Sequence, residues 1–118
     1  MSERANIKNL SVFLSGPMSG IENYNVAAFC EAHARLKALR PMRVYNPAIS
    51  YLTSGDEYLH TGWMMISLKE LLAGNNGYRY DVLIQLPGWQ QSKGAILEGL
   101  VAEGCGIEIA QLSDVLGE

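Results

Sequence analysis

Short apolar runs alternate with longer amphipathic stretches along the whole chain. The short runs are rich in β-branched and aromatic residues and end at Gly or Pro, as buried strands do. The longer stretches repeat apolar residues every three to four positions, which is the helical period. The predicted strands are residues 10–16, 42–47, 80–88 and 106–112. The predicted helices are residues 25–40, 58–73 and 93–104.

This alternation predicts an α/β fold, a small doubly wound parallel sheet of about four strands with helices on both faces. We expect the strand order 2-1-3-4 and a single domain over residues 1–118. In such sheets ligands bind beyond the carboxyl ends of the strands, where the winding direction reverses. That point lies between the first and third strands, and it selects two loops, residues 15–24 and 86–94.

The helix over residues 93–104 has an unusual acidic residue. We expect its apolar stripe to face the core, and that stripe consists of Ile96, Leu97, Leu100 and Val101. Glu98 points away from the centre of the stripe, and its lateral neighbours are small, namely Gly94, Ala95 and Ala102. This arrangement leaves space above the carboxylate, so Glu98 is a candidate catalytic group. A solvated helix charge is the alternative.

The loop after the first strand can bring backbone amides close to an anion, because its two glycines have no side chain that would block the approach. Its residues are Ser15, Gly16, Pro17, Met18, Ser19 and Gly20. They form neither a GxGxxG motif nor a P-loop, so an ordinary tight turn stays open.

The second loop places Ser92 at a helix start, followed by Lys93 and Gly94. A serine and free amides at that position can hold a phosphate or a sugar hydroxyl. A simple helix cap and a solvated lysine are the alternatives.

Composition narrows the classes of partner. Nine basic residues against 12 acidic ones give a net charge of −3 without a basic cluster, so we expect no nucleic-acid duplex. No apolar run approaches the roughly 20 residues that cross a membrane. The absence of a signal peptide and only two cysteines, Cys30 and Cys105, indicate a reducing, cytoplasmic setting. We expect no metal and no cofactor, since Cys30 and His33 have only His60, in a different segment, to complete a site.

The segments "FLSGPMSGIENYN" (13–25), "YNP" (45–47) and "LPGWQQSKGAILE" (86–98) carry a resemblance. Through them the chain resembles the nucleoside 2-deoxyribosyltransferase-like superfamily, which includes deoxyribosyltransferases and nucleotide N-glycoside hydrolases. It looks most like an uncharacterised branch common in phages and prophages, domain of unknown function family 4406. The resemblance covers most of the chain in element order. It implies a flavodoxin-like sheet and a homodimer or homotetramer in which a neighbouring subunit helps to close each site.

The resemblance also implies roles for individual residues. In characterised relatives a glutamate at the position of Glu98 attacks the anomeric carbon of the deoxyribose. The nucleotide hydrolases bind the 5′-phosphate with a serine at the position of Ser92 and with the first loop, here Gly16 to Gly20. The transferases have an aspartate in place of that serine, so Ser92 favours a nucleoside monophosphate.

One position departs from the family pattern. Relatives usually have an aspartate in the helix before the third strand, where it handles the base or its proton. The aligned residue here is Ser67, which is a poor proton donor. We expect Asp56 or Glu57 to supply the missing carboxylate by folding over the site. Tyr24 and Trp89 are expected to flank the crevice and stack on the base, with ordinary rim or core aromatics as the alternative.

The expected activity is cleavage of the N-glycosidic bond of a (deoxy)nucleoside 5′-monophosphate, with water or another base as acceptor. Glu98 must be ionised to attack, and its place in the early turns of its helix favours that form. Two alternatives stay open. One is a nucleotide-binding or sequestering module that has lost the chemistry, which Ser67 favours, and the other is cleavage of an NAD-type dinucleotide.

Overall fold

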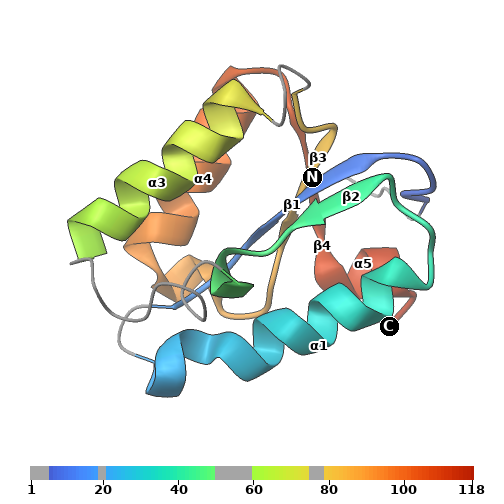
Figure 1. Ribbon diagram of the computed structural model, residues 1–118, viewed down its shortest axis with the longest axis horizontal. Helices are drawn as coiled ribbons and strands as arrows, with labels where there is room; N and C mark the ends of the chain where they lie inside the picture. The colour runs from blue at the N-terminus through green and yellow to red at the C-terminus, as the bar shows by residue number, and fades with distance from the viewer. Residues whose placement is uncertain (1–5, 19–20, 50–59, 75–78) are drawn as a thin grey trace.

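The sheet has the predicted order. The computed structural model describes residues 6–18, 21–49, 60–74 and 79–118. Within these ranges four parallel strands are arranged as β2-β1-β3-β4 (Figure 1). Their bounds are β1 (Ser11–Ser15), β2 (Arg43–Tyr45), β3 (Val82–Gln85) and β4 (Glu108–Gln111). The expected doubly wound α/β fold is therefore confirmed.

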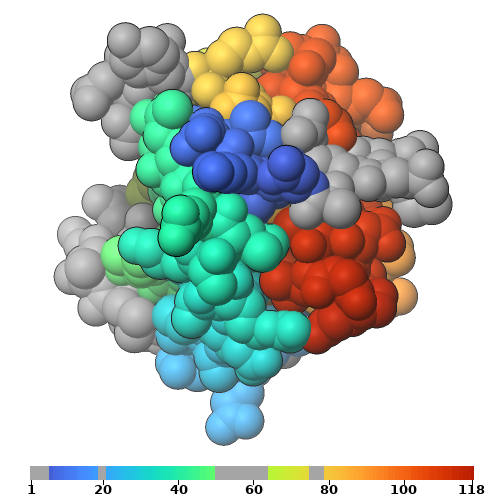
Figure 2. Space-filling model, turned by 90° about the vertical axis from the view of Figure 1, so that its right-hand side faces the viewer, coloured from blue at the N-terminus to red at the C-terminus, as the bar shows by residue number. Residues whose placement is uncertain are grey.

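Helices cover both faces of the sheet. On one face α1 (Val26–Lys37) packs beside α5 (Leu112–Leu116), and on the other α3 (His60–Ala73) packs beside α4 (Lys93–Gly104) (Figure 1). In the space-filling view the C-terminal segment, in red, lies against α1 (Figure 2). Arg35 of α1 forms an exposed ion pair with Glu118 there. No helix in the described part of the chain is both long and apolar enough to cross a membrane.

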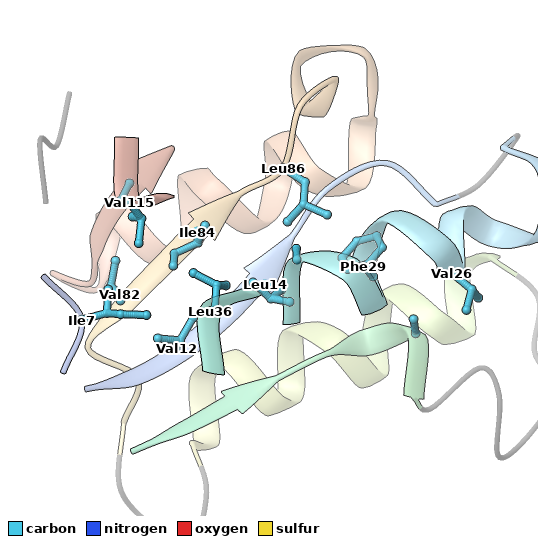
Figure 3. Packing of buried hydrophobic residues seen from close by; sticks show 13 residues of the cluster. Ile7, Val12, Leu14, Val26, Phe29, Leu36, Val82, Ile84, Leu86 and Val115 are labelled. Atoms are coloured by element: carbon cyan, nitrogen blue, oxygen red, sulfur yellow. The ribbon is translucent and has the colours of Figure 1, made fainter. Parts of the chain in front are cut away.

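Alternate strand residues form two separate cores. Val12 and Leu14 of β1 and Ile84 of β3 point to the face covered by α1, where they meet Phe29 and Leu36 of that helix (Figure 3). These five side chains are fully buried. The near-continuous apolar runs in the sequence predicted this burial, because parallel strands with helices on both faces carry apolar residues toward each face.

The core on the α3 and α4 face is smaller and more aromatic. Phe13 stacks on Tyr45 with ring centroids 4.9 Å apart and meets Tyr80 edge-on at 5.4 Å. Leu71 of α3 and Ala102 of α4 belong to the same cluster of buried residues. Ala102 is thus a core residue, which corrects the expectation that it borders open space beside Glu98.

Most of the apolar stripe predicted on α4 faces outward, so that prediction is wrong for three of its four residues, whereas Val101 packs against the core on the α3 and α4 face. Ile96, Leu97 and Leu100 are 37%, 41% and 62% exposed. The residues that α4 buries are Ala95, Glu98, Gly99 and Ala102. Small residues on this side let the helix axis lie close to the sheet, and the large apolar residues are left on the opposite side. Ala95 is likewise buried, so it does not border open space either.

Candidate active site at the carboxyl end of the sheet

Three strands end on polar side chains that form one row across the sheet, which we call the polar row. It consists of Ser15, Gln85 and Gln111, and the strand register pairs Ser15 with Gln85 and Gln85 with Gln111. The residues just before them belong to the core on the α1 face, namely Leu14, Ile84 and Ala110. Because successive strand residues point to opposite faces, the polar row faces α3 and α4.

Glu98 is held between this row and α3. Its side chain is buried, with 7% of the residue exposed. The Ser15 hydroxyl donates to Glu98 Oε1 at 2.6 Å, and the Ser67 hydroxyl donates to Glu98 Oε2. The carboxylate therefore joins β1, α3 and α4. The structure brings together three of the residues that the sequence singled out, Ser15, Ser67 and Glu98.

The surroundings of Glu98 disfavour its charge. Burial raises the pKa of the carboxyl above its ordinary value, and the hydrogen bonds from Ser15 and Ser67 oppose that rise. The sequence expectation was that the early helical turns favour the ionised form. That expectation is wrong. Glu98 lies five residues after the start of α4, whereas the favourable effect of the helix dipole on a negative charge is confined to the first turn.

The close contact between α4 and the sheet depends on Gly99. A Cβ atom at this position would lie 3.0 Å from Gln85 Nε2 in the polar row. Gly94, the third small residue expected to leave space beside Glu98, is half-buried in the first turn. The small residues of α4 therefore serve mainly to seat the helix on the strand ends.

The first loop is a tight packing point. A Cβ atom on Gly16 would lie 2.8 Å from Leu86 Cβ, so this glycine permits the ends of β1 and β3 to meet. The Pro17 carbonyl accepts a hydrogen bond from Asn25 Nδ2 at 2.9 Å, and Met18 packs against the α1 core. These contacts favour the ordinary tight turn for residues 16–18. Ser19 and Gly20 lie outside the described residues.

A left-handed turn connects this loop to α1. Asn23, Tyr24 and Asn25 have φ values of 51°, 52° and 61°. Asn25 directly precedes α1 but makes no capping bond, because its side chain reaches Pro17 instead. A left-handed conformation is common for Asn and unusual for Tyr, and it costs roughly 1–2 kcal/mol per residue. Tyr24 is half-buried in this turn.

In the second loop Ser92 caps α4 as predicted, since its Oγ accepts from the Ala95 amide at 3.1 Å. Lys93 is exposed. Trp89 is half-buried and donates its indole N–H to Gln111 Oε1 at 3.0 Å. The indole is thus directed to β4, whereas Glu98 bonds to β1 and α3.

Trp89 fixes the direction of a hydrogen-bond chain that the sequence reading missed. An indole can only donate, so Gln111 accepts with its oxygen and donates with its amide to Gln85 Oε1. Both glutamines line a groove of about 320 Å³ between α4 and β4, together with Trp89 and Glu103. The signal in the sequence was a Gln at the same position in two successive strands.

Cys30 and His33, which the sequence also offered as candidates, lie in α1, apart from the hydrogen bonds of Glu98. Asp56 and Glu57 lie outside the described residues. Cys30 packs against the α1 core, and Asn46 Nδ2 lies 3.2 Å from His33 Nδ1. Within the described ranges no group of three or more His, Cys, Asp or Glu residues is placed to hold a metal ion.

A family model described as Domain of unknown function (DUF4406) matches residues 10–111, which include all four strands and the three side chains of the Glu98 cluster. No curated protein and no solved structure shows a significant match.

Proposed function

Because the chain belongs to the family of unknown function DUF4406, we propose its activity from the site. The proposed reaction is cleavage of the N-glycosidic bond of a (deoxy)nucleoside 5′-monophosphate, with Glu98 as nucleophile. The observation that carries it is a buried glutamate at the winding reversal, held by hydroxyls from two elements. Perturbed carboxylates in such positions are typical of catalytic sites. The resemblance to nucleoside 2-deoxyribosyltransferase-like proteins supports the substrate class.

The chemistry proceeds in two displacements. A carboxylate oxygen of Glu98 bonds to the anomeric carbon as the bond to the base nitrogen breaks, and the electron pair leaves with the base. Water, or a second base, then attacks the same carbon and releases Glu98 as a carboxylate. The departing base takes up a proton from solvent, and the proton lost by the water returns to solvent. The first displacement requires the ionised form of Glu98, and the second regenerates it.

The phosphate is assigned to the start of α4. The Ser92 oxygen already accepts from the Ala95 amide, so its hydroxyl hydrogen is available to a ligand oxygen. Amides of the first helical turn favour an anion there. Gly94, beside Ser92, offers a backbone without a side chain. A 5′-phosphate at this point places the sugar along the helix toward Glu98.

Self-association is part of the proposal. Large apolar side chains are exposed on the outer sides of the two helices that carry Ser67 and Glu98. They are Met65, Leu72, Ile96, Leu97 and Leu100. A helix surface of this kind is typical of subunit contacts. We assign it to a homodimer or homotetramer in which a neighbouring subunit covers the site.

One observation favours a second candidate function. Ser67, and not an aspartate, contacts Glu98 in the described structure, and no carboxyl group among the described residues shares that contact. A site whose described residues include no carboxylic acid beside Glu98 suits a module that binds and sequesters a nucleotide. It also suits an NAD-type dinucleotide, whose pyridinium base departs without protonation.

The test is base release from a panel of ribo- and deoxynucleoside monophosphates, with NAD included. We expect release from at least one monophosphate and a loss of roughly 10⁴-fold or more in Glu98→Gln. Glu103→Gln on the same helix, an exposed position, is the matched control and keeps full activity. Binding of a nucleotide without release by the folded wild type would favour the binding module, and release from NAD alone would favour the dinucleotide.

A further inference from the structure

The carboxylate of Glu98 receives one hydroxyl on each oxygen, and the two hydroxyls come from different elements. Ser15 ends β1 and is fully buried, and Ser67 lies within α3 and is 8% exposed. These serines, which we call the serine pair, are separated from Glu98 by 83 and 31 residues in the chain. The contact is therefore a product of the tertiary fold.

We propose that Ser15 and Ser67 are positioning residues that together orient the Glu98 carboxylate toward the substrate. This inference rests on the proposed function, because it assigns the serine pair to the nucleophile of that reaction. It gives Ser67 a task different from that of the aspartate found at its place in relatives. Ser67 does not transfer a proton to the base; it holds the attacking group.

Geometry is the first argument for this role. A glutamate side chain has free torsions, and a nucleophile must be fixed within a few tenths of an ångström to attack efficiently. One hydrogen bond to each oxygen fixes both the position and the plane of the carboxylate. Each oxygen keeps a lone pair, so the anchored group remains able to bond to carbon.

Electrostatics is the second argument. Burial raises the pKa of Glu98, and the only described groups that lower it are the Ser15 and Ser67 hydroxyls. No charged side chain on the elements packed against α4 is among the causes of this pKa shift. The charged side chains concerned are Lys69 and Glu70 of α3 and Glu108 of β4, and on α4 itself Lys93 and Glu103. The serine pair is thus the described source of support for the ionised form.

The variant Ser67→Asp introduces the aspartate found in relatives, and it distinguishes a positioning role from a proton-transfer role. In Ser67→Asp a second carboxylate meets Glu98, and two carboxylates in contact share a proton and resist joint ionisation. We expect base release to fall about tenfold or more at neutral pH. Faster release by Ser67→Asp would overturn the proposal, because it would mean that the position serves proton transfer.

The direct experiment is a titration of the Glu98 carboxyl carbon by NMR in the whole protein labelled at glutamate. Glu98→Gln identifies the signal by its absence. We expect the midpoint to rise by about one pH unit or more in Ser15→Ala and in Ser67→Ala. Ser113→Ala, at an exposed serine of α5, is the control and leaves the midpoint unchanged. An unchanged midpoint in both alanine variants would overturn the proposal.

Kinetics supply the second readout. In each alanine variant we expect the acidic limb of the kcat/KM profile to move to higher pH by the same amount as the NMR midpoint, while Ser67→Thr restores the wild-type profile. A purely structural serine would lower activity without moving the limb, which would refute the positioning role. If wild type releases no base from any nucleotide, the proposed function fails, whereas the titration still decides whether the pair supports the Glu98 anion.

Discussion

At the scale of single residues, Glu98 links stability to pH. Its folded-state pKa lies above the ordinary value of 4.5 because the side chain is buried. Between the two values the folded chain keeps a proton that the unfolded chain has released. Stability therefore falls as pH rises through this window, by at most about 1.4 kcal/mol per pH unit for one proton. Glu98→Gln removes this dependence, so we expect a flatter profile of unfolding free energy against pH.

Urea denaturation of wild type and Glu98→Gln at several pH values above 4.5 measures the effect. The difference between the two proteins isolates Glu98 from other titrating groups such as His33, whose pKa is lowered by burial and by Lys37. Glu103→Gln, which removes an exposed carboxylate from the same helix, should run parallel to wild type. Parallel curves for Glu98→Gln as well would contradict a raised pKa.

At the scale of elements, the meeting of β1 and β3 depends on Gly16. A Cβ atom there would lie 2.8 Å from Leu86 Cβ, which belongs to a buried core residue and cannot move aside. We expect Gly16→Ala to lower the free energy of unfolding by about 1–3 kcal/mol, as overpacking in cores does. Gly104→Ala is the matched control, because nothing lies within 4 Å of its Cβ position at the end of α4. Chemical denaturation compares the two, and equal stabilities would contradict the packing argument.

The elements themselves were predictable because their signals are local. The apolar strand runs, their alternation with helices and the Ser92 cap predicted the elements, and the alternation predicted the strand order. The strand order then identified the loops that lead to the site. The buried side of α4 was not predictable by the usual rule, which assumes that the apolar stripe faces the core of the same chain. Here Gly99 and its small neighbours pack against the sheet, and Ile96, Leu97 and Leu100 of the stripe are exposed.

The candidate site, like the elements, was only partly predictable from the sequence. Glu98 was identified from its small neighbours and from the family motif, and it does lie at the carboxyl end of the sheet. Its bond to Ser67 depends on how α3 and α4 are rotated about their axes, which no pattern within either helix sets. The chain from Trp89 through Gln111 to Gln85 depends likewise on strand register. Contacts between distant elements therefore required the structure.

At the scale of the whole molecule, the exposed apolar side chains of α3 and α4 make self-association testable. Leu100 is 62% exposed, so a charged side chain at this position is harmless to a monomer but is desolvated at a subunit contact. We expect Leu100→Lys to leave the melting temperature of dilute protein nearly unchanged and to weaken association at least about tenfold. Sedimentation velocity over a concentration series measures this.

Met42→Lys provides the comparison at this scale, because Met42 is 65% exposed and precedes β2, so it belongs to neither α3 nor α4. Its sedimentation should match that of wild type at every concentration. If a neighbouring subunit also covers the Glu98 site, base release per chain should fall in Leu100→Lys on dilution earlier than in wild type. A wild type that sediments as a monomer at all concentrations would contradict the proposed oligomer.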